Sequence, residues 1–160
     1  MEDQILRRLQ RLEDIEAIRK LKHAYCYACD DGYNTDKLRP LFAVDAVWEA
    51  EGFGRYVGPD EICTFFEGVS SQIVAAAHLV MNDVIEISDD GMTATGVWRN
   101  CQPVTAMSDG KQQAMWMLAR YDEEYVKIGG RWYFRELVAS IQYAAPYETG
   151  WADLWPQRYL

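Results

Sequence analysis

Histidine, cysteine and long apolar runs are scarce in this sequence, and each scarcity excludes a class of protein. The 160 residues include two histidines and four scattered cysteines, which is typical of reduced thiols rather than of a disulfide framework. No apolar run approaches the roughly 20 residues that a membrane helix needs. The acidic start, Met1-Glu2-Asp3, lacks the basic and then apolar pattern of a signal peptide. We therefore expect a cytoplasmic protein with no membrane partner.

Positive charge is scarce too, with 16 basic residues against 25 acidic ones and a net charge of -9. Because nucleic-acid binding depends on basic side chains that neutralise phosphates, we expect no nucleic-acid partner. Motifs for metals and cofactors are also lacking, since there is no HExxH and no glycine-rich phosphate loop. Cys26 and Cys29 have CxxC spacing, but they lie late in a predicted helix, away from the helix N-terminus that lowers a thiol pKa. The sequence favours a site with no metal and no cofactor.

Apolar and aromatic residues are plentiful, and the length predicts one domain over residues 1–160. Six tryptophans and ten tyrosines are enough both to fill a core and to line a ligand pocket. Apolar residues recur every three or four positions through residues 3–30, which predicts a long helix. Shorter helices are predicted over 36–42 and 59–69, with a hairpin over 45–57 between them.

Three dipeptides typical of tight hairpin turns divide the rest of the chain. They are Asp90-Gly91, Asp109-Gly110 and Gly129-Gly130. They predict four consecutive antiparallel strands near 73–88, 92–107, 111–127 and 131–145. Strands this long coil strongly, which gives the sheet a concave face for the helices to cover. The predicted fold is α+β, with a strongly curved antiparallel sheet, a half-barrel or cone, whose concave face is covered by the N-terminal helices.

The chemistry of such a cone would depend on His78 and Asp30. His78 lies in the apolar segment 75–82 of a predicted strand, so it is buried or faces a pocket, although it could equally be a structural histidine bonded to the backbone. Asp30 ends the first helix and could equally be a solvated turn residue. If Asp30 turns into the cone, its carboxylate would fix the His78 tautomer and make the imidazole a general base. His23, on a charged stretch, is expected at the surface.

Aromatic and amide side chains are expected to complete the pocket, although each aromatic could instead be ordinary core. The predicted substrate-binding residues are Trp48, Phe53, Phe65, Asn82, Trp98, Asn100, Trp116 and Tyr143. Gln102 adds a possible hydrogen-bond donor. Strand 73–88 is apolar on both faces, which predicts that one face lines the cavity and the other packs in a homo-oligomer, a dimer or a trimer. The aromatic segment 151–160 is expected to pack over the cavity mouth or on a neighbouring subunit.

A series of short segments spans nearly the whole chain in a distinctive order. The segments are Ile15–Leu21, Tyr25–Asp30, Leu41-Phe42, Asp45–Trp48, Gly58-Pro59, His78 with Asn82, Thr93–Gly96 and Gly129–Trp132. In order and spacing they resemble the SnoaL-like family of the nuclear-transport-factor-2-like (cystatin-like) superfamily. No single segment is diagnostic, and the resemblance depends on the whole series.

The resemblance implies a catalytic Asp30–His78 dyad in an apolar pocket, with Tyr25 at a position where a dehydratase of this family has a tyrosine. It implies a cofactor-independent lyase, a dehydratase or a dehydrohalogenase-like enzyme. Such an enzyme would act on a small hydrophobic, cyclic substrate by general-base elimination. The superfamily also contains polyketide cyclases, isomerases and non-catalytic binding or interaction domains, which use the same fold.

Overall fold

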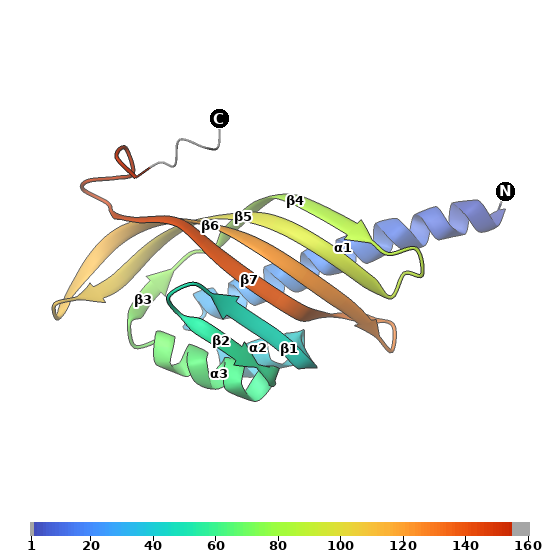
Figure 1. The fold of residues 1–160 in the computed structure, drawn as a ribbon, viewed down its shortest axis with the longest axis horizontal. Helices are drawn as coiled ribbons and strands as arrows, with labels where there is room; N and C mark the ends of the chain where they lie inside the picture. The colour runs from blue at the N-terminus through green and yellow to red at the C-terminus, as the bar shows by residue number, and fades with distance from the viewer. Residues whose placement is uncertain (1, 155–160) are drawn as a thin grey trace.

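The computed structural model describes residues 2–154, in which helices lie against the concave side of a curved sheet (Figure 1). The helices are α1 (Glu2–Asp30), α2 (Thr35–Leu38), the 3-10 helix η1 (Arg39–Leu41) and α3 (Gly58–Val69). The strands are β1 (Phe42–Ala50), β2 (Gly54–Val57), β3 (Ile73–Ala76), β4 (Leu79–Ile87), β5 (Thr93–Ser108), β6 (Lys111–Ile128) and β7 (Arg131–Pro146). The predicted α+β class and the strongly curved sheet are confirmed.

The long helix α1 has two halves with different surroundings. Its C-terminal half runs beneath the long strands, where Ile18 and Tyr25 are buried. Its N-terminal half projects past the end of the sheet (Figure 1), so Ile5 and Leu12 remain more than half exposed. Within residues 2–154, no helix is long and apolar enough to cross a membrane.

A pair of left-handed residues ends α1. Gly32 and Tyr33 have φ angles of 69° and 57°, and the amide of Tyr33 donates to the Cys29 carbonyl at 3.0 Å. A glycine in this position is a common helix terminator because it lacks a Cβ. The tyrosine that follows is uncommon there. The double turn leaves Asp30 as the last residue of the helix.

The sheet is mixed, which corrects the antiparallel prediction at one edge. Its strands run in the order β2-β1-β7-β6-β5-β3, and β4 also pairs with β5. Strands β4 to β7 form the predicted antiparallel meander, with tight turns at Asp109-Gly110 and Gly129-Gly130, where all four residues have positive φ. However, β1 pairs with β7 in parallel. The meander leaves one side of β7 unpaired, and β1 satisfies its backbone groups.

The predicted strand over 73–88 is wrong as a single strand, because the chain leaves the ladder around His78, between β3 and β4. The pairing register with β5 is the same on both sides of this break. Ala76 pairs with Val104, and Leu79 pairs with Cys101. His78 is therefore held at a fixed point along β5 while its own backbone is released from regular pairing.

Buried aromatic rings and thiols form the core between α1 and the sheet. The ring of Tyr25 packs edge-on against Phe42, Phe66 and Phe134, with centroid distances of 5.6 to 6.3 Å. Such edge-to-face contacts stabilise a core beyond the area that they bury. Burial raises the pKa of the nearby Cys26 thiol to about 12, so this cysteine is an inert core residue rather than a reactive one.

The C-terminal segment packs on the side of the sheet away from α1. The indole of Trp151 contacts Trp116 and Tyr143, with ring centroids 6.0 Å apart in both pairs. Tyr143 pairs across the sheet with Leu118, which alternates with the inward-facing Met117 and Ala119 of β6. Up to residue 154 the segment therefore does not cover the cavity mouth. Residues 155–160 of the predicted contact lie outside the described residues.

Candidate active site

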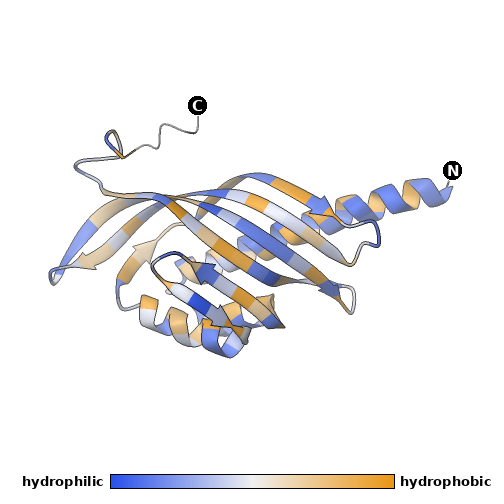
Figure 2. Cartoon of the chain, in the orientation of Figure 1, coloured by the Kyte–Doolittle hydropathy of each residue, from blue (hydrophilic) through white to orange (hydrophobic). Residues whose placement is uncertain are grey.

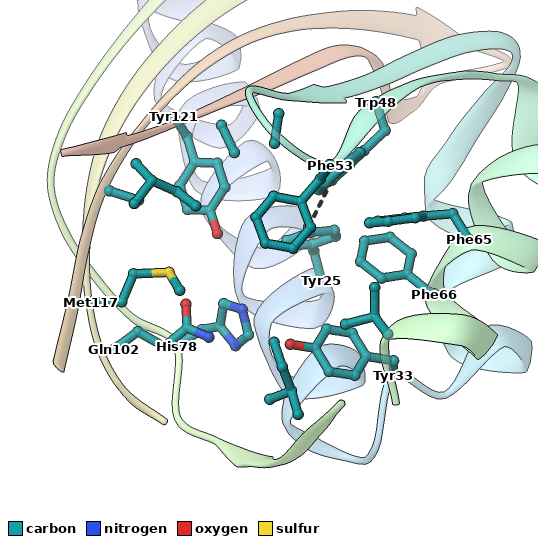
Figure 3. A pocket seen from close by; sticks show the side chains of 16 residues that line it. Tyr25, Tyr33, Trp48, Phe53, Phe65, Phe66, His78, Gln102, Met117 and Tyr121 are labelled. Carbon is teal, nitrogen blue, oxygen red and sulfur yellow. Dashed lines mark hydrogen bonds between the residues drawn. The ribbon is translucent and has the colours of Figure 1, made fainter. Parts of the chain in front are cut away.

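One cavity opens between α1, α3 and the concave face of the sheet, and aromatic rings form most of its wall (Figure 3). It holds about 530 Å³ of space free of protein atoms, including its open mouth. The lining residues are Tyr25, Tyr33, Trp48, Ala50, Phe53, Phe65, Phe66, Val69, Ile73, His78, Gln102, Met117, Ala119, Tyr121, Ala139 and Ile141. An apolar, aromatic wall of this kind suits a small hydrophobic molecule.

The structure brings Asp30 and His78 together at the wall of this cavity. The Nδ1 atom of His78 lies 2.6 Å from Oδ1 of Asp30. The same carboxylate accepts the backbone N–H of His78, at 3.0 and 3.2 Å from its two oxygens. With the carboxylate as acceptor, Nδ1 is the donor, and a neutral imidazole in this orientation has its lone pair on Nε2. The His78 side chain is only 5% exposed, so this lone pair faces the cavity rather than bulk water.

The local backbone explains why these two residues meet. The end of α1 places Asp30 beside the gap between β3 and β4. The backbone N–H of His78 is free to donate to the carboxylate because the chain leaves the ladder there, while the amide of Ala77 still donates to Pro103. The carboxylate thus holds both the ring and the backbone of the histidine. Asp30 itself lies behind His78 and does not line the cavity.

Tyr25 lines the same cavity. It accepts a hydrogen bond from the indole N–H of Trp48 at 3.0 Å, which leaves the hydroxyl proton available to another acceptor. Burial raises the pKa of Tyr25 well above its usual value, and Cys29 adds to the increase. The phenol therefore stays protonated at neutral pH and can act as a hydrogen-bond donor.

A buried ion pair lies behind the cavity. Lys22 pairs with Glu123, and both side chains are fully buried. The ammonium Nζ lies 3.4 Å from the ring centroid of Tyr121 and 4.8 Å from that of Tyr25. Glu123 also accepts the hydroxyl proton of Tyr125. Tyr25 and Tyr121 are thus packed directly against the Lys22 ammonium, whose charge Glu123 neutralises.

Several predicted substrate-binding residues do line the cavity, but three lie on other surfaces. Trp48, Phe53 and Phe65 line it. Trp116 and Tyr143 are wrong as cavity residues, because they lie on the opposite face of the sheet with Trp151. In β7 a register shift separates Ile141, opposite Ala119, from Tyr143, opposite Leu118. This irregularity reverses the face that simple alternation assigns.

Asn82 is also wrong as a cavity residue. It is exposed, with a φ angle of 55°, at a register shift between Met81 and Val84. The next residue, Asp83, bonds to Arg19 of α1 at 2.8 Å. The β-bulge therefore turns Asn82 outward and uses its neighbour to attach β4 to the helix.

Trp98 and Asn100 face the correct side of the sheet but lie behind the cavity wall. Trp98 is 1% exposed and donates its indole N–H to the Tyr125 hydroxyl at 3.0 Å. It lies in the part of the sheet that α1 covers. Asn100 is fully buried and donates to the side-chain oxygen of Gln102 at 2.8 Å. Neither residue lines the cavity. His23, as expected, is exposed.

Sequence reasoning missed Tyr33 and Tyr121 as cavity residues and named Gln102 only as a possible hydrogen-bond donor. Tyr33 lies in a turn after the helix, where no periodicity identifies the direction of a side chain. Tyr121 and Gln102 could have been found by alternation along β6 and β5, because Trp98, Asn100 and Gln102 share one face. The missing information was the pairing register, which only the structure supplies.

The comparisons with known proteins agree with this architecture. The profile of the SnoaL-like domain family matches residues 10–138, and the chain belongs to this family. A hexachlorocyclohexane dehydrochlorinase, LinA-type3 from Novosphingobium barchaimii LL02, is 24% identical, with a TM-score of 0.79 over 86% of this chain and 92% of that chain.

Two further solved structures share the fold. A scytalone dehydratase candidate from Novosphingobium aromaticivorans is 20% identical, with a TM-score of 0.76 over 92% of both chains. An NTF2-like protein with a cystatin-like fold, from the same organism, is 20% identical, with a TM-score of 0.67 over 86% of this chain and 87% of that chain. At these identities the likeness shows a common fold, and the function has to be argued from the cavity.

Proposed function

We propose that this protein is a cofactor-independent lyase that removes water or a hydrogen halide from a small hydrophobic, cyclic substrate. The observation that carries the proposal is the contact of 2.6 Å between Asp30 and His78 in an apolar cavity. An oriented imidazole with a free lone pair is a general base. The names of two structural neighbours, a dehydrochlorinase and a scytalone dehydratase candidate, support the same reaction class.

In the proposed reaction, Nε2 of His78 forms a bond to a substrate proton as the C–H bond breaks. The electron pair of that bond forms the new C=C bond, and the bond to the leaving group breaks on the neighbouring carbon. Asp30 stabilises the imidazolium that forms. Tyr25 donates a hydrogen bond to the departing hydroxide or halide, and the proton taken by His78 leaves with that group. The net products are an alkene and water or hydrogen halide.

The residues of the cavity wall have a separate role in the proposed reaction. Trp48, Phe53 and Phe65 exclude water and position the ring of the substrate through apolar contact. Trp48 has a second part, because its N–H fixes the Tyr25 hydroxyl at 3.0 Å. Replacing Trp48 would therefore affect both the fit of the substrate and the orientation of the donor.

The experiment measures elimination with two probes, 3-hydroxycyclohexanone and hexachlorocyclohexane, by following alkene and chloride release. Asp30→Asn and His78→Ala should each lower kcat by about 10²- to 10⁴-fold, the usual contribution of a general base. Asp31→Asn and His23→Ala are matched controls, because both residues are exposed and line no part of the cavity. They should keep the parent rate.

Circular dichroism of each variant separates lost chemistry from lost folding. A folded Asp30→Asn or His78→Ala variant with near-parent turnover would refute the proposed mechanism. Substrate conversion to an isomer or a cyclised product, with no water or halide released, would replace elimination by an isomerase or cyclase that uses the same base. A cavity that binds both probes and transforms neither would assign the protein to the non-catalytic members of the fold.

A further inference from the structure

A second apolar space, which we call the outer groove, adjoins the active-site cavity on the side of the β5–β6 hairpin. It holds about 1140 Å³ free of protein atoms, against about 530 Å³ for the cavity, with the solvent at the mouth included in both. Five residues line both spaces, namely Phe53, Phe65, Val69, Ile73 and Met117. The residues that line the groove beyond the cavity include Tyr56, Val104, Ala106, Met107, Met115 and Ala144. The two spaces are therefore continuous.

The pairing of β5 with β6 extends the cavity wall into the outer groove. Gln102 pairs with Met117, and both side chains line the cavity (Figure 3). Val104 and Met115 form the next pair on the same face, and both line the groove. Since every second residue of a strand shares a face, one surface runs from the cavity to the hairpin. From Gln102 to Ala106 it covers roughly 13 Å at the usual rise per residue.

The ring of Phe65 forms part of the wall of both spaces. Trp48, which lines the cavity and not the groove, packs on it with ring centroids 4.7 Å apart. Tyr56, which lines the groove and not the cavity, stacks on it at 4.4 Å. The Tyr56 hydroxyl donates to the backbone carbonyl of Phe53 at 2.7 Å. The polar end of this tyrosine is thus occupied, and its ring adds an apolar surface to the groove.

The side chains of the outer groove suit an uncharged, apolar occupant. Of the residues that the structure describes, no charged one lines the groove, and only Tyr56 and Gln72 bring polar side chains to it. Met107 is 42% exposed, and Met115 and Met117 are half-buried. Flexible methionine side chains adapt to the shape of an apolar ligand. Exposed apolar surface that adjoins a pocket is typical of a ligand-binding groove.

We propose that the outer groove binds an apolar chain of the substrate whose ring occupies the cavity beside His78. The substrate class is then a cyclic compound with an uncharged alkyl or aryl substituent, rather than an isolated ring. This inference rests on the proposed function, which places the reacting ring in the cavity. The shared wall favours the substrate over a second protein chain as the occupant, because whatever fills the groove lies against whatever fills the cavity.

Isothermal titration calorimetry tests the groove with two series of ligands, the 3-alkylphenols and the 4-alkylphenols, from phenol to the pentyl compounds. In the parent protein, affinity should rise roughly threefold with each methylene in at least one series, the usual gain from burying this group. Two series are needed because the orientation of the ring decides which carbon faces the groove. An affinity that does not rise with chain length in either series would overturn the proposal.

Two variants change the outer groove in different ways. Met115→Gln makes its wall polar, and Ala106→Phe fills part of its space. Both residues line the groove and neither lines the cavity. Each variant should weaken pentylphenol binding at least about tenfold and change phenol binding less than about twofold, because phenol does not reach the groove. A rise with chain length that both variants keep would place the chain elsewhere and refute the assignment.

Met92→Gln and Ala114→Phe are the matched controls. Both residues are exposed, and neither lines the cavity or the groove. Ala114 precedes Met115 in β6, so its side chain lies on the opposite face of the sheet. Both controls should bind every phenol as the parent does. Losses of pentylphenol binding as large as those of Met115→Gln and Ala106→Phe would show a general effect of the substitutions and contradict the proposal.

Turnover separates this inference from the proposed function. The parent should favour 5-pentyl-3-hydroxycyclohexanone over 3-hydroxycyclohexanone at least about tenfold in kcat/KM, and Met115→Gln should reduce this preference. Elimination that needs Asp30 but shows no preference for the pentyl compound overturns the groove and keeps the enzyme. Phenol binding that rises with chain length and loses this rise in Met115→Gln, in a protein that catalyses no elimination, supports the groove and overturns the proposed enzyme.

Discussion

Replacing Lys22 by methionine tests the buried ion pair behind the cavity. Lys22 and Glu123 are both fully buried, so water cannot solvate the carboxylate once its partner is removed. Breaking a buried pair in this way destabilises a protein by about 3–5 kcal/mol. Domains of this size have about 5–15 kcal/mol of stability in total. We therefore expect Lys22→Met to fold but to lose a large part of its free energy of unfolding.

Urea unfolding followed by circular dichroism measures the loss. With a denaturant slope of about 2 kcal/mol/M, typical of a small protein, a loss of 3–5 kcal/mol lowers the midpoint by about 1.5–2.5 M. The double variant Lys22→Met/Glu123→Gln removes both charges and leaves an amide oxygen that can still accept from Tyr125. It should recover at least about 2 kcal/mol of the loss.

A neighbouring ion pair provides the control. Lys20 and Glu16 pair at 3.8 Å on the exposed side of α1, and both side chains are more than half exposed. Lys20→Met should therefore change the free energy of unfolding by less than about 1 kcal/mol. A Lys22→Met midpoint equal to that of Lys20→Met, or a double variant no more stable than Lys22→Met, would refute the reasoning from burial.

Two further predictions follow from the bulge in β4 and from the projecting half of α1. Asn82→Gly should keep parent stability and turnover, whereas Asn82→Val should lose about 1–2 kcal/mol in urea unfolding because a β-branched residue resists a φ angle of 55°; loss of turnover in a folded Asn82→Gly would return this residue to the site. We also propose that the chain forms a homo-oligomer through the apolar residues on the projecting turns of α1 (Figure 2), where Leu6 and Leu9 are about half exposed. Sedimentation velocity should show a dimer or trimer that Leu6→Glu/Leu9→Glu dissociates, and a monomeric parent would contradict this.

Local sequence patterns predicted the helices, the strands and their turns. They did not predict all of the pairing between strands. The helix over 3–30 and the turns at Asp109-Gly110 and Gly129-Gly130 are local features, set by periodicity and by residues that accept positive φ. The parallel edge between β1 and β7 joins segments that are far apart in the chain. No local pattern encodes which free strand edge a distant strand will fill.

The candidate site shows the same division at the level of single residues. The sequence by itself determined that His78, in an apolar segment, and Asp30, at a helix end, were the groups available for base chemistry. Only the tertiary structure decided that Asp30 reaches His78, because that contact needs the gap between β3 and β4. It also decided which amide and which tyrosine lie beside the base. Alternation along a strand gives two faces, and one bulge or one break exchanges them.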